Sequence, residues 1–339
     1  MYLFGGISPG NASLSIPFYN PVDAFSRSID SDIGSISDMW RFDFDTNQTT
    51  ANVTLLLASN QTDDFVLRNR GALVPLSSTQ LVLLGLFGLT EPRSSISSFI
   101  YDIPTGQFDT TAVSPAVDDV ALPALLLDDD RPSGGFSVST VQGISFIFGH
   151  LFELRSGDEM RLWTARPISD FRGTSTILRW QADVARLQPV ARTGAATMRG
   201  PGGVVYVFAG FSGILLSDLW KFTPPDRWEH LQQQSGMRPR ARVEHTVAPL
   251  DNFNFLIFGG AAATSCLADL WRFDANTEQW TFVNDFASES AVASGFRGHS
   301  MVLHNDRLLV FGGKCGDDNF DSTVFILDIA APFSVTTVN

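Results

Sequence analysis

One stretch decides the fold: RVEH (residues 242–245), NFLIFGG (254–260), ADLWRFD (268–274) and QWTFV (279–283). The first segment opens a strand, and the other three have the apolar patterning and length of β-strands. Gly259 and Gly260 allow the chain to turn and let neighbouring backbone come close. Residues 276–278, Asn-Thr-Glu, form a turn before the last strand. The stretch therefore predicts a four-stranded antiparallel β-meander.

The same pattern occurs six times along the chain. Each short apolar run ends at one or two small residues, and an aromatic residue follows after a gap. Successive aromatics lie between 51 and 64 residues apart, and a period near 50 with strand patterning is typical of β-propellers. The aromatics are Trp40, Phe99, Trp163, Trp220, Trp271 and Phe325. The repeat glycines are Gly5, Gly6, Gly85, Gly149, Gly210, Gly259, Gly260, Gly312 and Gly313.

The stretch that decides the fold strongly resembles the kelch-repeat family, in which an Arg and His strand, a double glycine and paired aromatics recur. The sixth unit keeps Arg297 and His299, whereas the fourth has Ala195 where the fifth has His245. The resemblance implies an all-β, six-bladed kelch-type β-propeller of four-stranded antiparallel blades, related to the galactose-oxidase propellers. A single domain spans residues 1–339, with blades at approximately 1–62, 71–120, 131–183, 192–233, 238–285 and 295–339.

Both ends of the chain bear on how the propeller closes. Residues 1–6 read as a second strand, so the first blade lacks its first strand within this sequence. Propellers close by lending a strand from one terminus to the blade at the other, which leaves no exposed edge. We therefore expect the missing strand outside this sequence, and the chain to belong to a larger polypeptide or assembly. No stretch approaches the roughly 18 apolar residues of a membrane span, so direct membrane insertion is not expected.

Two features favour an extracellular or cell-surface location. Cys266 and Cys315 follow the double glycines of neighbouring units, where a disulfide can form. Four glycosylation sequons begin at Asn11, Asn47, Asn52 and Asn60. Alternatively, the sequons are chance matches in a polar region and the cysteines are free thiols of a cytosolic protein.

Strand parity places the loops between strands two and three, and those between blades, on one face. A long insertion between residues 7 and 37 lies there, and insertions of that size are commonly functional or disordered. We predict that this face binds a partner protein or glycan. Its candidate residues are Phe18, Tyr19, Phe25, Arg192, Arg240, Arg242 and Arg297. Alternatively, the arginines are structural and pair with neighbouring blades.

The sequence offers little for catalysis. The five histidines form no metal-binding cluster, the tyrosines do not assemble a galactose-oxidase-like copper site, and no cofactor is expected. Asp317, Asp318 and Asp321 are weak calcium candidates without EF-hand spacing. A net charge of −13 argues against nucleic acid, because phosphate repulsion would require a concentrated basic patch.

These observations favour a non-catalytic extracellular recognition or structural module that binds protein or glycan. Two alternatives remain open. One is an intracellular kelch adaptor for protein–protein interaction. The other is a secreted galactose-oxidase-like or carbohydrate-active enzyme.

Overall fold

The structure is a computed structural model in which the following residues are described: 2–9, 33–44, 51–57, 72–75, 79–87, 95–109, 116–117, 136–141, 144–149, 161–169, 176–183, 188–190, 192–232, 236–288, 294–313, 315, 324–330 and 333–338. Over these residues the regular structure is β-strand, apart from the short 3₁₀ helices η2 (Pro201–Gly203) and η3 (Phe286–Ser288). The fold is therefore all-β, as predicted.

The described strands form six sheets. The first contains β1 (Tyr2–Pro9), β2 (Ile33–Phe44) and β3 (Ala51–Leu57). The second contains β4 (Ala72–Pro75), β5 (Gln80–Phe87), β6 (Ser95–Asp102) and β7 (Gln107–Asp109). The third contains β8 (Ala116–Val117), β9 (Phe136–Val141), β10 (Ile144–Gly149), β11 (Arg161–Ser169) and β12 (Thr176–Asp183).

The remaining three sheets have four strands each. The fourth contains β13 (Ala196–Arg199), β14 (Val205–Phe211), β15 (Leu215–Thr223) and β16 (Arg227–Leu231). The fifth contains β17 (Thr246–Pro249), β18 (Asn254–Phe258), β19 (Asp269–Asp274) and β20 (Gln279–Asp285). The sixth contains β21 (Ser300–His304), β22 (Arg307–Phe311), β23 (Val324–Asp328) and β24 (Ser334–Val338).

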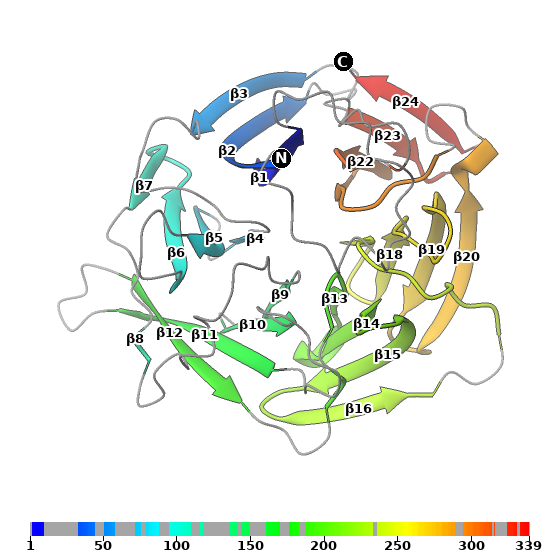
Figure 1. The fold of residues 1–339 in the computed structure, drawn as a ribbon, viewed down its shortest axis with the longest axis horizontal. Helices are drawn as coiled ribbons and strands as arrows, with labels where there is room; N and C mark the ends of the chain where they lie inside the picture. The colour runs from blue at the N-terminus through cyan, green and yellow to red at the C-terminus, as the bar shows by residue number, and fades with distance from the viewer. Residues whose placement is uncertain are drawn as a thin grey trace.

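The four-stranded sheets are antiparallel meanders in sequence order, which confirms the predicted strand pattern. Figure 1 shows the sheets arranged one after another around a central axis, with the last strand of each four-stranded sheet on the outside. Strands near the axis link neighbouring sheets: β4 lies against β1 and β9, β13 lies against β9 and β17, and β17 lies against β21. The sheets therefore meet face to face, and each covers its neighbour.

Small residues at the end of the second strand keep neighbouring sheets close. Gly259 and Gly260 follow β18 with φ angles of 65° and 98°. A Cβ atom on Gly260 would lie 2.8 Å from the Cβ atom of His245. A Cβ atom on Gly259 would lie 2.9 Å from the carbonyl oxygen of Phe296, in the segment that leads into the next sheet. Glycine is needed here both for the turn and for the close approach.

The other repeat glycines occupy related places. Gly5 and Gly6 lie in β1, where the register with β2 shifts between Phe4 and Gly6. The register of β14 with β15 shifts in the same way between Phe208 and Gly210. The remaining glycines are Gly85 within β5, Gly149 at the end of β10, and Gly312 and Gly313 directly after β22.

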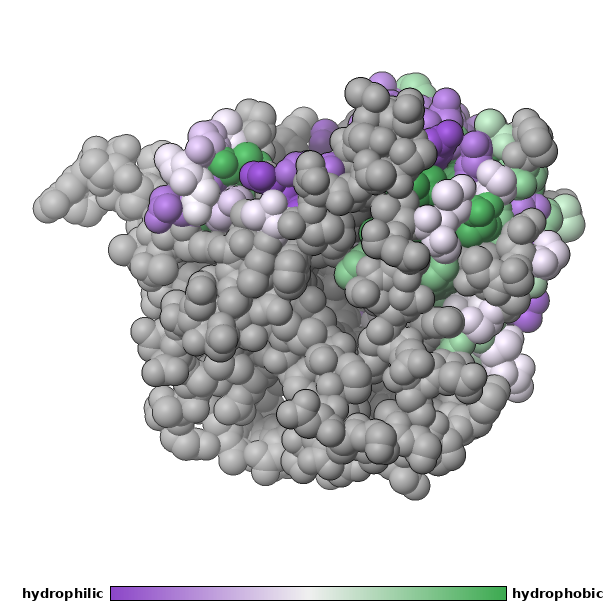
Figure 2. Space-filling view, turned by 90° about the horizontal axis from the view of Figure 1, so that it is seen from above, coloured by the Kyte–Doolittle hydropathy of each residue, from purple (hydrophilic) through white to green (hydrophobic). Residues whose placement is uncertain are grey.

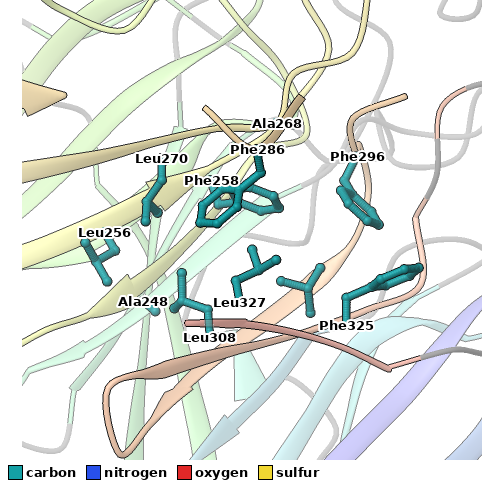
Figure 3. Close-up of a cluster of buried hydrophobic side chains, with 11 residues drawn as sticks. Ala248, Leu256, Phe258, Ala268, Leu270, Phe286, Phe296, Leu308, Phe325 and Leu327 are labelled. Atoms are coloured by element: carbon teal, nitrogen blue, oxygen red, sulfur yellow. The ribbon is translucent and has the colours of Figure 1, made fainter. Parts of the chain in front are cut away.

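The hydrophobic core lies between the sheets. In Figure 3, side chains of the fifth sheet and η3 face side chains of the sixth sheet. Phe296 contacts Phe258 on one side and Phe325 on the other, with ring centroids 5.8 and 5.1 Å apart. The cluster comprises Ala248, Leu256, Phe258, Ala268, Leu270, Phe286, Phe296, Leu308, Val310, Phe325 and Leu327.

A second cluster fills the space between the fourth and fifth sheets. Tyr206 packs edge-on against Phe273, with centroids 5.1 Å apart, and Phe208 lies 4.8 Å from Trp280. Every residue of β14 is buried, because both faces of this strand are covered. A strand enclosed in this way reads as a continuous apolar run rather than an alternating one.

Two sequence predictions are corrected by the backbone. Residues 116–117 were expected to belong to the second blade, but β8 pairs in parallel with β12 of the third sheet, where it extends an outer edge. The insertion predicted for residues 7–37 is shorter, because Ile7 pairs with Ser35 and Pro9 pairs with Ile33. Its two ends therefore extend the β1–β2 hairpin.

Candidate binding face

Backbone hydrogen bonds join the segments that lead into the first strands of the last three sheets. The N–H group of Glu244 donates to the carbonyl oxygen of Gly194, and that of Gly298 donates to the carbonyl oxygen of Glu244, both at 2.9 Å. The N–H group of Arg242 donates to the carbonyl oxygen of Leu216, near the start of β15, at 3.1 Å. These segments and the connections between second and third strands lie at the same end of the sheets, which we term the loop face.

Arg242 lies inside the protein behind this face. Its side chain is fully buried and donates to both carboxylate oxygens of Asp269 at 2.8 Å. It also donates to the carbonyl oxygen of Gly259 at 2.9 Å. The indole N–H of Trp271 donates to the same carboxylate at 2.7 Å. The arginine thus ties the start of the fifth sheet to its second and third strands.

Arg192 has the same role in the fourth sheet. Its buried guanidinium contacts the two carboxylate oxygens of Asp218 at 2.6 and 2.9 Å, and the carbonyl oxygen of Ala209 at 3.0 Å. Burial raises the pKa of Asp218, but hydrogen bonding and the charge of Arg192 outweigh burial, so the pKa is lowered. The prediction that Arg192 and Arg242 contact a partner is therefore wrong, because both guanidinium groups are buried within the fold.

The sixth sheet has a different residue at this position. Gly260 donates its N–H to the carbonyl oxygen of Phe296 at 2.7 Å, as Gly210 donates to the carbonyl oxygen of Arg242 at 2.9 Å. Phe296 therefore occupies the place of Arg242, and Arg297 follows one residue later. Aligning Arg297 with Arg242 from the sequence was wrong by one position. The Nε atom of Arg297 lies 3.6 Å from a carboxylate oxygen of Glu244, and its side chain is 31% exposed.

His245 and His299 act as spacers between sheets. His245 packs edge-on against Phe208, and His299 against Phe258, with ring centroids 5.4 and 5.5 Å apart. Burial lowers the pKa of His299 to about 3. Burial also holds the pKa of His245 well below its ordinary value, and the charge of Arg242 adds to this effect. Both rings are therefore neutral at physiological pH.

A disulfide joins Cys266 to Cys315, as predicted, with a Cα–Cα distance of 5.8 Å. The two cysteines lie in the connections that follow the second strands of the fifth and sixth sheets. The N–H group of Cys315 donates to the carbonyl oxygen of Gly295 at 3.4 Å, in the segment that leads to Phe296. The disulfide therefore links two neighbouring parts of the loop face.

The loop face exposes several residues that sequence reasoning did not select. Val190 is 49%, Ile214 67% and Met237 73% exposed. Arg240 and Arg238 are also exposed, and the partner contact predicted for Arg240 stays a prediction. A repeat within the sequence signals part of this surface: residues 188–192 read QPVAR and residues 238–242 read RPRAR.

Several predicted site residues lie outside the described residues. They are Phe18, Tyr19, Phe25, the sequon residues Asn11, Asn47 and Asn60, and the calcium candidates Asp317, Asp318 and Asp321. Asn52 lies in β3, opposite Asp43 of β2, and its glycosylation stays a prediction.

The rest of the described surface shows no second candidate site. On the side of the molecule seen in Figure 2, hydrophilic and hydrophobic residues of the described part lie next to one another. Among the residues that the structure describes, no three His, Cys, Asp or Glu side chains group as metal ligands would. A helix with the length and apolarity to cross a membrane is not found in the described part of the chain.

Comparison with known proteins identifies the repeats. Residues 226–336 match a family model described as the KLHDC2/KLHL20/DRC7 Kelch-repeats domain. A probable serine/threonine-protein kinase of Dictyostelium discoideum is 30% identical over 118 residues, which is 33% of this chain and 9% of the kinase.

Two further relatives give the same result. A leucine-zipper-like transcriptional regulator 1 homolog of Drosophila melanogaster is 29% identical over 117 residues, covering 32% of this chain and 12% of that protein. Acyl-CoA-binding domain-containing protein 4 of Arabidopsis thaliana is 32% identical over 111 residues, covering 31% and 16%. The similarity thus spans only a small part of each relative. Residues 226–336 of this chain therefore contain kelch repeats.

Proposed function

We propose that the chain is a six-bladed kelch propeller that binds another protein through its loop face and catalyses no reaction. Kelch repeats over residues 226–336 support this proposal, because kelch domains are in general non-catalytic binding modules. The circular arrangement of the sheets in Figure 1 supports a single domain over residues 1–339.

One observation carries the choice of face. In QPVAR and RPRAR, the buried positions keep the same residues: Pro189 matches Pro239, and Arg192 matches Arg242. The exposed position between them changes from Val190 to Arg240. The fold thus holds the backbone constant and varies the side chains that solvent or a partner meets. Loops that a rigid scaffold positions in this way commonly carry binding residues.

Hydrogen–deuterium exchange would test the choice of face. A partner would first be captured with the full chain and purified. Binding should then slow exchange in segments 188–195, 211–216, 236–245 and 262–266. Exchange should stay unchanged in hairpins 224–226, 250–253 and 275–278, which lie at the opposite end of the sheets. Protection confined to these hairpins would contradict the proposal.

We also propose that the protein works outside the cell or at its surface. The disulfide between Cys266 and Cys315 supports an oxidising compartment. The sequons at Asn11, Asn47, Asn52 and Asn60 point the same way. Phe18, Tyr19 and Phe25 remain proposed contacts on the loop face. A glycan partner is compatible with this location, but exposed Ile214 and Met237 favour a protein.

An intracellular adaptor is the competing proposal. Intact mass before and after deglycosylation and reduction separates the two on protein taken from its natural source. The extracellular proposal expects a mass loss on glycosidase treatment, and two thiols that react with iodoacetamide only after reduction. Unmodified sequons together with two thiols that react without reduction would support the adaptor.

A further inference from the structure

The three most exposed large hydrophobic side chains among the described residues lie in loops of the fourth and fifth sheets at the loop face. Val190, Ile214 and Met237 are 49%, 67% and 73% exposed. Val190 and Met237 lie in the segments that lead into the fourth and fifth sheets, and Ile214 lies between β14 and β15. Exposed apolar residues that cluster, rather than scatter singly, mark interaction sites.

The backbone that carries these side chains is held in place by the buried arginines. The Nε atom of Arg192 donates to the carbonyl oxygen of Val190, and that of Arg242 donates to the carbonyl oxygen of Arg240, both at 3.1 Å. The hydrogen bond from Arg242 to the carbonyl oxygen of Leu216 ties the second segment to the start of β15. The exposed residues therefore sit on a preorganised surface, which lowers the entropy lost on binding.

The loop that carries Ile214 is closed by its own backbone hydrogen bond. The N–H group of Ser212 donates to the carbonyl oxygen of Ile214 at 3.0 Å. Leu216, two residues later, accepts the hydrogen bond from Arg242. The loop that contains Ile214 is thereby joined to the segment that contains Met237, between the fourth and fifth sheets.

Positive charge adjoins these apolar residues. Arg238 and Arg240 are exposed, and no described carboxylate lies within ion-pair distance of either side chain. The protein as a whole carries a net charge of −13. At physiological ionic strength, charges are screened beyond roughly 8 Å, so a bound segment experiences the local arginines more than the distant carboxylates.

We propose that Val190, Ile214, Met237, Arg238 and Arg240, termed the arginine–apolar patch, bind a protein segment that mixes acidic and apolar residues. This inference rests on the proposed protein-binding function and names its partner class. The two guanidinium groups pair with carboxylates, for which their geometry is suited. The three apolar side chains cover the segment's hydrophobic residues and exclude water from the ion pairs.

Fluorescence anisotropy with defined peptide pools tests the proposal on the full chain. The first pool contains labelled 12-residue peptides of Asp, Glu, Leu and Phe. Matched pools replace the acids by Lys, or the apolar residues by Ser. The first pool should bind at least tenfold more tightly than either matched pool, and its affinity should fall as salt rises.

Variants locate the binding site. R238E/R240E should weaken binding of the acidic–apolar pool at least tenfold, and I214S/M237S at least fivefold. The matched controls are R227E and F253S. Arg227 begins β16 directly after hairpin 224–226, and Phe253 lies in hairpin 250–253. Both are exposed at the opposite end of the sheets, so each control should change affinity less than twofold. Unchanged melting temperatures would show that all four proteins are folded.

Each other outcome has a definite meaning. Preference for the Lys pool, equal binding of all pools, or loss of binding in the controls overturns the partner class. Binding of a labelled oligothymidylate through Arg238 and Arg240, without peptide binding, also overturns it. If a captured partner still slows exchange on the loop face, the proposed function survives while this inference fails.

Discussion

The fifth and sixth sheets solve the same packing problem with different chemistry. In the fifth, buried Arg242 is bound by Asp269, whose other donor is Trp271. In the sixth, Phe296 occupies the place of the arginine and contacts Phe325, with centroids 5.1 Å apart. The same backbone connection is retained, because Phe296 accepts a hydrogen bond from the preceding sheet as Arg242 does.

This difference separates what the fold requires from what it tolerates. It requires a large group that fills the space between the first strand and the third, and both an ion pair and a phenylalanine pair do so. Buried ion pairs can often be replaced by apolar groups of similar volume without loss of stability. Removing one member alone is costly, because the other charge stays buried without a partner.

The largest expected effect is therefore a single substitution in the fifth sheet. Asp269→Thr should lower the free energy of unfolding by about 3–5 kcal/mol, because Arg242 stays buried without its carboxylate. Urea denaturation measures the change. Asp218→Thr is the matched control and should cost less, since the side chain of Asp218 is 23% exposed against 11% for Asp269. A loss below about 1 kcal/mol for Asp269→Thr would show that the ion pair is dispensable.

A triple substitution sharpens the comparison. R242F/D269T/W271F gives the fifth sheet the residues found at the matching positions of the sixth, where Thr323 precedes Val324 and Phe325. Its free energy of unfolding should come within about 2 kcal/mol of the wild type, above that of Asp269→Thr alone. If the triple variant is no more stable than the single one, the two sheets are not interchangeable at this site.

The sequence predicted those parts of the fold that depend on repeated burial. The strand at Asn254–Phe258 and the disulfide between Cys266 and Cys315 have the predicted positions. The end of the strand and the positions of the cysteines were both located from a double glycine. The backbone turn at this place requires glycine, so the residue type reveals the turn in the sequence. The displaced alignment of Arg297 could not be found in this way. Arg297 lies two residues before His299, whereas Arg242 lies three residues before His245, and the backbone hydrogen bond to Phe296 sets the register.

The candidate site was less predictable than the fold. Arginines at Arg192 and Arg242 look like surface residues in the sequence, but they are buried because Asp218 and Asp269 lie two residues before the repeat tryptophans. Exposure of a residue such as Ile214 depends on which neighbouring loops cover it, and no local pattern encodes that. The choice of residues for the proposed arginine–apolar patch therefore required the three-dimensional structure.

The disulfide links the two sheets that differ, so its removal tests their interface. C266S/C315S should lower the free energy of unfolding by about 3 kcal/mol, because the cross-link constrains a long loop of the unfolded chain. Dithiothreitol should lower the melting temperature of the wild type to that of the double variant. It should leave the melting temperature of the double variant unchanged. An unchanged melting temperature of the reduced wild type would contradict a stabilising role.

Acid should destabilise the packing between neighbouring sheets, because His245 and His299 are buried there. Because burial lowers the pKa of His299 to about 3, the unfolded chain takes up protons below about pH 6.5 while the folded ring stays neutral. The contribution of His299 to stability should therefore fall as pH drops from 6.5 towards 3, by about 1 kcal/mol per pH unit. His245, whose pKa is also lowered, adds to this slope.

Variants assign the pH dependence. His299→Gln retains a polar group near Thr246, whose hydroxyl lies 2.5 Å from the Nε2 atom of His299. His245→Phe keeps an aromatic ring against Phe208. Each should reduce the slope of unfolding free energy against pH between 6.5 and 5, and the double variant should reduce it most. A slope unchanged in the double variant would assign the acid sensitivity to other groups.

The smallest expected effect concerns Glu244, which adopts a φ of 58° where its counterparts Gly194 and Gly298 have φ of 60° and 63°. A side chain in this left-handed conformation costs about 1 kcal/mol relative to glycine. Its partly exposed ion pair with Arg297, at 3.6 Å, contributes less than about 1 kcal/mol. Glu244→Gly should therefore stabilise the protein by about 0.5 kcal/mol, whereas Arg297→Gln, which removes only the ion pair, should destabilise it slightly. If Glu244→Gly is less stable than Arg297→Gln, the carboxylate of Glu244 has a structural role beyond its ion pair. If Glu244→Gly is more stable than the wild type, Glu244 is a strained residue on the loop face that packing alone does not require.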